Sequence, residues 1–205
     1  MTGGERFHLD GVTESVFGLE REVILFDTEF TCWEGSQERA WSGPNEYREI
    51  VEIGAVRVNG DTLEELAALD IIVKPKINPI LSDYFIRLTA ITKERVDAEG
   101  VPFAEAIGRF AAWCGERVLY CFGRDQDVLV ENCALAGISF PLAGADFRNA
   151  RDIFERHGVP PGKFSSGNIL KAFGLEPRQR PHGALNDARG ILDGFRELVR
   201  RAGPA

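Results

Sequence analysis

The sequence Val23-Ile24-Leu25-Phe26-Asp27-Thr28-Glu29 indicates where the centre of this fold lies. Its four leading residues form a short apolar run, which predicts a strand buried inside a sheet. The run ends at two carboxylates, Asp27 and Glu29, which lie two residues apart and therefore face the same side of a strand. Because burying two unpaired carboxylates together is costly, they indicate either a site for a divalent cation or a strand end that faces water.

The next two strands are predicted directly after this run. Residues 50–58 are rich in β-branched side chains, and the Asn59-Gly60 pair that follows is the strongest short signal for a hairpin. The return strand is expected over residues 66–73, and two more short strands over 118–122 and 147–150. We therefore expect five strands.

Helical patterns fill most of the remaining chain. They cover residues 79–85, 92–96, 102–114, 128–135, 165–173 and 185–199. Helices that alternate with strands after an initial hairpin predict an α/β fold, with a mixed five-stranded central sheet flanked by helices. We expect one domain over residues 21–200, preceded by a lead-in segment over residues 1–20.

The composition narrows the class of protein. The chain has 205 residues, 44% of them hydrophobic, and a net charge of −8, which argues against a protein that coats nucleic acid without specificity. No apolar run reaches the roughly 20 residues of a membrane span, and the polar N-terminal segment is not a secretory signal. The four cysteines form no CxxC pair, so we expect buried reduced thiols in a cytoplasmic protein without a membrane partner.

A third carboxylate follows another predicted strand. Asp125 comes after residues 118–122, and it could belong to a site or cap the next helix. Asp127 is expected in the first turn of that helix, where the helix dipole favours a structural carboxylate. An exchange of roles between Asp125 and Asp127 stays open at this point.

His182 and Asp187 form the last candidate group. They are five residues apart and can converge only if His182 lies in a loop and Asp187 in the first turn of the following helix. Pro181 and Gly183 favour such a loop. Taken alone, the pair is explained more simply by a surface histidine and a helix-terminal aspartate. The absence of GxxxxGK[ST], HExxH and GxSxG motifs argues against nucleoside triphosphatases, zinc proteases and α/β-hydrolases.

Taken in order, these motifs resemble the DEDDh, or DnaQ-like, 3′→5′ exonucleases over about residues 21–200. The resemblance rests on Phe26–Phe30, Glu49–Ala55, Asp125 and His182-(x4)-Asp187. Residues 74–92, with Lys74-Pro75 and Leu88-Thr89-Ala90-Ile91-Thr92, are more similar to the Eri-type branch, whose members trim structured or small RNAs. Two features depart from the family: Arg124 and Gln126 flank Asp125 where an aromatic residue is common, and the loop 33–47 is long.

The resemblance implies a ribonuclease H-like fold and phosphodiester hydrolysis with two Mg²⁺ or Mn²⁺ ions. It implies that Asp27, Glu29, Asp125 and Asp187 hold the ions, and that His182 acts as the general base. The residues that would contact the 3′-terminal nucleotide are Phe30, Leu88, Thr89 and Ile91, with core packing as the alternative for the last three. Arg178 and Arg180 either contact phosphate or lie in a solvated loop.

The implied substrate is single-stranded nucleic acid or a 3′ overhang, with RNA favoured over DNA and nucleoside 5′-monophosphates released. A DNA proofreading or repair subunit is the alternative activity, and an inactive nucleic-acid-binding module is a more distant one. A sugar hydrolase using Asp27 and Glu29 would need neither His182 nor a metal. A homodimer, or a polymerase or ribonucleoprotein partner, is also compatible with the sequence.

Overall fold

A mixed sheet with a buried central strand organises the fold. The computed structural model describes residues 16–202, so most of the predicted lead-in lies outside the described residues. Six strands pair in the order β4-β3-β2-β1-β5-β6. Strand β1 (Glu22–Phe30) runs antiparallel to β2 (Ile50–Asn59) and parallel to β5 (Val118–Cys121). The predicted mixed α/β architecture is confirmed.

The outer strands complete the sheet on both sides. Strand β3 (Glu65–Lys74) is antiparallel to β2, and β6 (Phe147–Asn149) is parallel to β5. The five predicted strands are present, and a sixth, β4 (Val101–Pro102), pairs in parallel with β3. The expectation of five strands missed β4 because it has two residues, one of them a proline, which is a poor strand signal.

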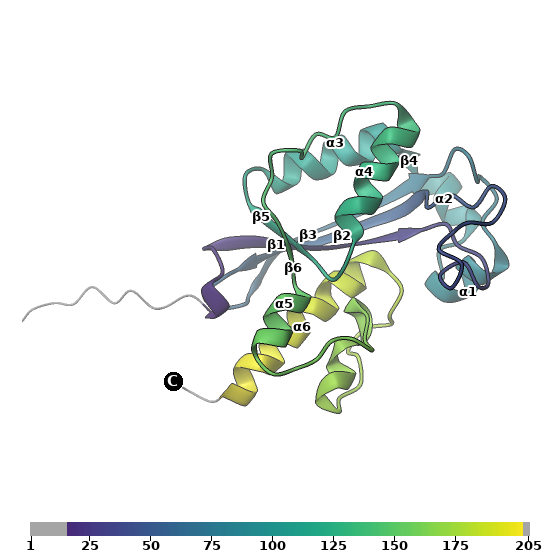
Figure 1. Cartoon of the computed structure of the whole chain (residues 1–205). Helices are drawn as coiled ribbons and strands as arrows, with labels where there is room; N and C mark the ends of the chain where they lie inside the picture. Colours follow the sequence, from purple (N-terminus) through teal and green to yellow (C-terminus); the bar gives the residue numbers. More distant parts are fainter. Residues whose placement is uncertain (1–15, 203–205) are drawn as a thin grey trace, which may run out of the picture.

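Helices cover both faces of the sheet and one of its ends (Figure 1). They are α1 (Asp83–Thr89), α2 (Lys93–Glu99), α3 (Phe103–Cys114), α4 (Asp125–Ala136), α5 (Arg151–Arg156) and α6 (Ala184–Ala202), with the 3₁₀ helices η1 (Val16–Gly18) and η2 (Ser166–Phe173). Figure 1 shows α3 and α4 on one face and α5 and α6 on the other, while α1 and α2 lie beyond the end of the sheet. The sequence analysis did not predict α5, whose six residues are too few for a periodic pattern.

Strand β1 is buried on both faces, and this explains its apolar run. Val23 and Leu25 belong to the core under α6, whereas Ile24 and Phe26 belong to the core under α3 and α4. Because side chains alternate along a strand, Asp27 continues the row of Val23 and Leu25. It therefore faces α6, the helix that carries Asp187.

The first turn of α6 lies directly against β2. A Cβ added at Gly54 would be 1.9 Å from the backbone nitrogen of Leu185 and 2.2 Å from the carbonyl carbon of Ala184. Only glycine allows so close an approach of two backbones. Gly54 pairs with Asp27 in the register of β1 and β2, so the start of α6 is brought beside the carboxylates.

Two smaller sequence expectations can be compared with the structure. Within residues 16–202, no helix combines the length and the apolar character that a bilayer span requires. All four cysteines are buried and none forms a disulfide bond, as predicted.

Candidate active site

Four carboxylates from three elements meet where β1 ends. Asp27 lies on β1 and is 7% exposed, Asp125 is the first residue of α4, and Asp187 on α6 is 3% exposed. Burial raises the pKa of the Asp27 carboxyl well above its ordinary value, and the charges of Asp125, Asp187 and Glu29 raise it further. The structure thus brings together the four acidic residues that the sequence singled out.

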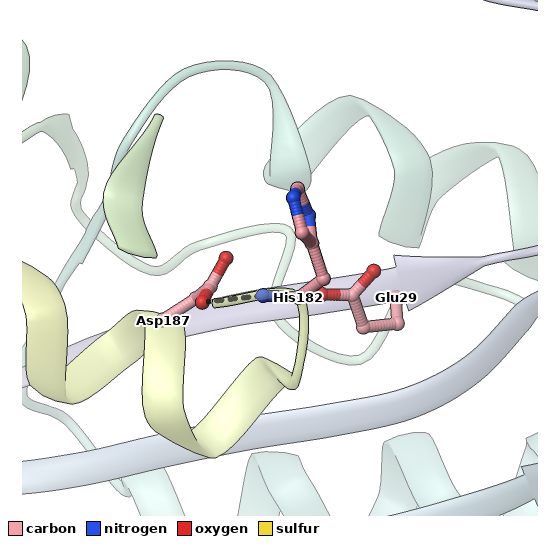
Figure 2. A group of neighbouring side chains, drawn as sticks. All are labelled: Glu29, His182 and Asp187. Carbon is pink, nitrogen blue, oxygen red and sulfur yellow. Dashed lines mark hydrogen bonds between the residues drawn. The ribbon is translucent and has the colours of Figure 1, made fainter. Parts of the chain in front are cut away.

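Glu29, His182 and Asp187 form a compact group within this cluster (Figure 2). Each offers one ligand atom, and these atoms all lie within 4.8 Å of one another. Burial raises the pKa of Glu29 well above its usual range, and the neighbouring carboxylates Asp187, Glu52 and Asp125 add to the shift. Burial also raises the pKa of Asp187, to about 6.

His182 lies in a tight turn just before α6, as predicted from the spacing. Its backbone N–H donates to Asp187 Oδ1 at 3.0 Å, the bond drawn in Figure 2. Its φ of 66° lies in the left-handed region, which costs a residue with a side chain roughly 1–2 kcal/mol. Burial lowers the pKa of the imidazole, and the charge of Arg180 lowers it further, so the neutral form of the ring is favoured at neutral pH.

The structure shows that Asp125 and Asp127 have different contacts. Asp125 Oδ1 accepts hydrogen bonds from the Thr28 hydroxyl at 2.7 Å and the Thr28 N–H at 3.1 Å, which ties α4 to β1 beside Asp27. Asp127 instead pairs with Arg124 at 2.7 Å on the surface. Arg124 occupies the N-cap position of α4 without a side-chain capping bond, and Asp125 is the first helical residue, so Asp125 is not the cap.

Ser166 is a contact of the cluster that the sequence analysis did not find. This buried residue begins η2, and its Oγ lies 2.8 Å from Asp27 Oδ1 and 3.3 Å from Asp187 Oδ2. The next residue, Gly167, packs against Asp187 so closely that a Cβ would lie 2.2 Å from Oδ1. A serine in a helical pattern has no spacing relation to Asp27, so no signal in a single sequence identifies it.

The residues predicted to contact substrate fall into two groups. Phe30 is half-buried next to Glu29, and its ring lies 5.4 Å from that of Trp41 in the long loop 33–47. Leu88 is half-buried at the end of α1. Thr89 donates its hydroxyl to Phe85 O, and Ile91 is 1% exposed within an apolar cluster. The last two therefore have packing partners, although both also line a pocket of about 270 Å³.

The two arginines before His182 are engaged with the protein. Arg178 pairs with Asp193 at 3.5 Å. Arg180 donates to the carbonyl oxygens of Arg87 at 3.2 Å and Leu88 at 3.5 Å. Arg180 thereby connects the loop before His182 to the end of α1.

The carboxylate cluster lacks cationic partners. Among the described residues, no lysine or arginine forms an ion pair with Asp27, Glu29, Asp125 or Asp187. Buried carboxylates without a cation are costly, and carboxylate oxygens are the ligands that Mg²⁺ and Mn²⁺ prefer. The donor set therefore fits divalent cations.

Comparison with known proteins gives a consistent picture. Residues 24–195 match the protein family described as Exonuclease. The 3'-5' exoribonuclease 1 of Mus musculus is 28% identical to this chain over an alignment of 181 positions that covers 82% of this chain and 50% of that protein. The chain thus spans about half the length of this relative.

Two solved structures are similar over most of the chain. The first is the nuclease domain of 3'hExo, a DEDDh family member, bound to rAMP, with a TM-score of 0.73 and 27% identity over 89% of this chain and 93% of that one. The second describes 3'-end specific recognition of histone mRNA stem-loop by 3'-exonuclease, with a TM-score of 0.70 and 26% identity over 87% of this chain and 63% of that one.

Proposed function

Since the chain belongs to the exonuclease family, in the Eri-type part of its DEDDh branch, we propose that it is a 3′→5′ exoribonuclease. It would release nucleoside 5′-monophosphates from single-stranded 3′ ends. The predictions of the family and of a ribonuclease H-like fold are confirmed by these similarities.

The observation that carries the proposal is the convergence of four unpaired carboxylates with one histidine. Asp27, Glu29, Asp125 and Asp187 would hold two divalent ions, Mg²⁺ or Mn²⁺, as their oxygen donors and their lack of cationic partners suggest. Bound ions would acidify water and neutralise the charge that grows on the phosphate during hydrolysis. A sugar hydrolase would need only two carboxylates and does not account for the other two.

His182 would act as the general base. Its ring nitrogen and the nearest oxygens of Glu29 and Asp187 lie within 4.8 Å of one another, so a water held by these carboxylates is within reach of the imidazole. The lowered pKa keeps the ring neutral and able to accept the proton of the attacking water. Asp187 would have a second task, because it accepts the His182 N–H and so fixes the turn that carries the base.

We further propose that the favoured substrate is RNA with a single-stranded 3′ end. Two similar structures contain rAMP or concern a histone mRNA stem-loop, which supports RNA. A paired 3′ end would have to be opened before its last nucleotide could reach carboxylates as buried as Asp27. Phe30 and Leu88 are half-buried and would contact that nucleotide, whereas Thr89 and Ile91 would do so from the 270 Å³ pocket.

The test uses RNA and DNA strands of one sequence, labelled at the 5′ end, with Mg²⁺, with Mn²⁺ and with EDTA. We expect a ladder of products shortened from the 3′ end, which forms only with metal. It should form faster on single-stranded RNA than on single-stranded DNA, and faster on single strands than on blunt duplex. Asp27→Ala should abolish the ladder, and Asp127→Ala, which alters a surface carboxylate nearby, should leave it unchanged. Faster cleavage of DNA would favour a proofreading or repair enzyme, and no shortening by folded wild-type protein would refute the activity.

The remaining sequence predictions concern location and assembly. A cytoplasmic location, a homodimer and a polymerase or ribonucleoprotein partner stay predictions. Size-exclusion chromatography with light scattering tests the homodimer directly, because a dimer doubles the mass of 22.7 kDa expected for one chain.

A further inference from the structure

A buried glutamate next to the candidate active site has a contact that the proposed chemistry does not use. From its geometry we infer that Glu52 is a positioning residue, whose carboxylate holds the turn 180–184 so that the His182 ring reaches the carboxylate cluster. The inference rests on the proposed function, since it assigns Glu52 a part in presenting the proposed base.

The first observation is a direct bond from Glu52 to the turn. Glu52 lies on β2, is 3% exposed, and pairs with Glu29 in the register of β1 and β2. Its Oε2 accepts the N–H of Ala184 at 2.6 Å. Ala184 is the first residue of α6 and follows His182 by two positions, so a strand carboxylate satisfies one of the free N–H groups at this helix start.

The second observation is that Glu52, unlike the four site carboxylates, has a cationic partner. Arg95 on α2 donates to Glu52 Oε1 at 3.3 Å and to Asp70 Oδ2 at 3.0 Å. Burial raises the pKa of Glu52 to about 7, and the charge of Arg95 opposes this rise only in part. A buried carboxylate that has a guanidinium partner still has less to gain from a metal ion than one without a cation. The pair therefore favours a positioning role for Glu52 over a role as a further metal ligand.

The third observation is that the turn 180–184 has an unfavourable backbone conformation, so contacts must stabilise it. His182 has a left-handed backbone, which is unfavourable for a residue with a Cβ. On one side the turn borders the pocket of about 270 Å³, which Glu52, Arg95 and Gly183 line together. The end of the turn packs on Gly54, but on the pocket side it is held by polar contacts. The bond from Ala184 to Glu52 is one, and the bond from His182 to Asp187 is another.

The test measures the environment of the His182 ring directly, in metal-free protein of the whole 205-residue chain. The chain has three histidines, so their imidazole signals in a ¹³C–¹H spectrum are few, and His182→Ala identifies the relevant one. Glu52→Ala should shift or broaden the His182 signal. Glu52→Gln keeps an oxygen that can accept the Ala184 N–H, and should leave the signal close to that of wild type.

A matched control separates positioning from a general loss of stability. Glu49 is also a buried glutamate, 6% exposed, just before β2, but it accepts backbone N–H groups of Lys76 and Ile77 at 2.7 and 2.8 Å. Glu49→Ala should lower the melting temperature without moving the His182 signal. If Glu52→Ala does not fold, Arg95→Met is the second variant. It removes the anchor of the carboxylate, and should move the same signal.

Kinetics on a short single-stranded RNA provide the second readout. A misplaced base should lower kcat of Glu52→Ala by about ten- to hundredfold with little change in KM, and Glu52→Gln should recover most of the rate. An unmoved His182 signal in both Glu52→Ala and Arg95→Met, or an equal shift in Glu49→Ala, would overturn the inference. So would a Glu52→Gln variant as slow as Glu52→Ala with a higher Mg²⁺ requirement, which marks a metal ligand. An inactive wild type would refute the proposed function alone, because the spectra do not depend on activity.

Discussion

Replacing Ser166 by alanine tests whether the hydroxyl between Asp27 and Asp187 is needed to keep these carboxylates ready for metal. A serine has one O–H, so it can donate to only one carboxylate at a time, and the 2.8 Å contact with Asp27 is favoured over the 3.3 Å contact with Asp187. This bond lowers the pKa of Asp27, against burial and three neighbouring carboxylates that raise it. Its loss should therefore favour the protonated carboxyl, which binds metal poorly.

The expected size follows from the strength of one such bond. A hydrogen bond to a charged group contributes roughly 1.5–3 kcal/mol, and about 1.4 kcal/mol corresponds to a factor of ten. We therefore expect Ser166→Ala to raise the half-saturating Mg²⁺ concentration by roughly ten- to hundredfold, in the range seen when groups that orient metal ligands are removed. High Mg²⁺ should restore much of the maximal rate, because the four ligands themselves remain.

The assay is the initial rate of shortening of labelled single-stranded RNA over a wide Mg²⁺ titration. Ser36→Ala is the matched control: Ser36 is 1% exposed, and its hydroxyl accepts the Trp33 N–H at 2.8 Å without touching a carboxylate. It should leave the Mg²⁺ requirement unchanged. A Ser166→Ala enzyme with wild-type rate and Mg²⁺ dependence would show that the hydroxyl does not hold the site together.

Three further predictions follow from the same geometry. In EDTA, the free energy of unfolding should fall by roughly 3 kcal/mol as pH rises from about 4 through about 6. The reason is that the raised pKa of Asp187 keeps a proton on the folded protein that the unfolded chain has already lost. Mg²⁺ should oppose this fall in thermal melts, and an unfolding free energy that does not change with pH would contradict the prediction. Gly54→Ala places a Cβ 1.9 Å from a backbone atom of α6 and should cost roughly 3 kcal/mol or more in urea unfolding, whereas Gly108→Ala, with no atom within 4 Å, should be neutral or stabilising. Arg180→Gln should raise the pKa of His182 and move the acid limb of the kcat–pH profile to higher pH, and the same limb in Arg178→Gln should not move.

The parts of the fold that could be predicted are those that depend on residues close together in the sequence. The apolar run before Asp27 indicates a strand buried on both faces, and Pro181 and Gly183 indicate the turn before α6. Strand β4 and helix α5 were missed because two and six residues are too short to carry a period. The boundary of α1 was also displaced, since the helix begins at Asp83, where Ser82 caps it, rather than at residue 79.

The parts of the site that escaped prediction depend on distant contacts. Asp125 and Asp127 both follow a strand, and what distinguishes them is a bond to Thr28, 97 positions away. Ser166 and Glu52 act on residues 139 and 132 positions away, and no local pattern encodes such distances. Family resemblance supplied Asp125, but it gave no information about the hydroxyl or the carboxylate that hold its neighbours in place.

These long separations also mean that the carboxylate cluster cannot assemble in part of the chain. The contact between Asp27 and Ser166 forms only after η2 has been synthesised, and the turn with His182 needs α6 packed on β2. A nascent chain still attached to the ribosome, or a fragment cut before η2, therefore has the first carboxylates but lacks the contacts that assemble the cluster. During chemical denaturation, the carboxylate cluster should therefore be lost together with the cooperative unit that contains η2 and α6.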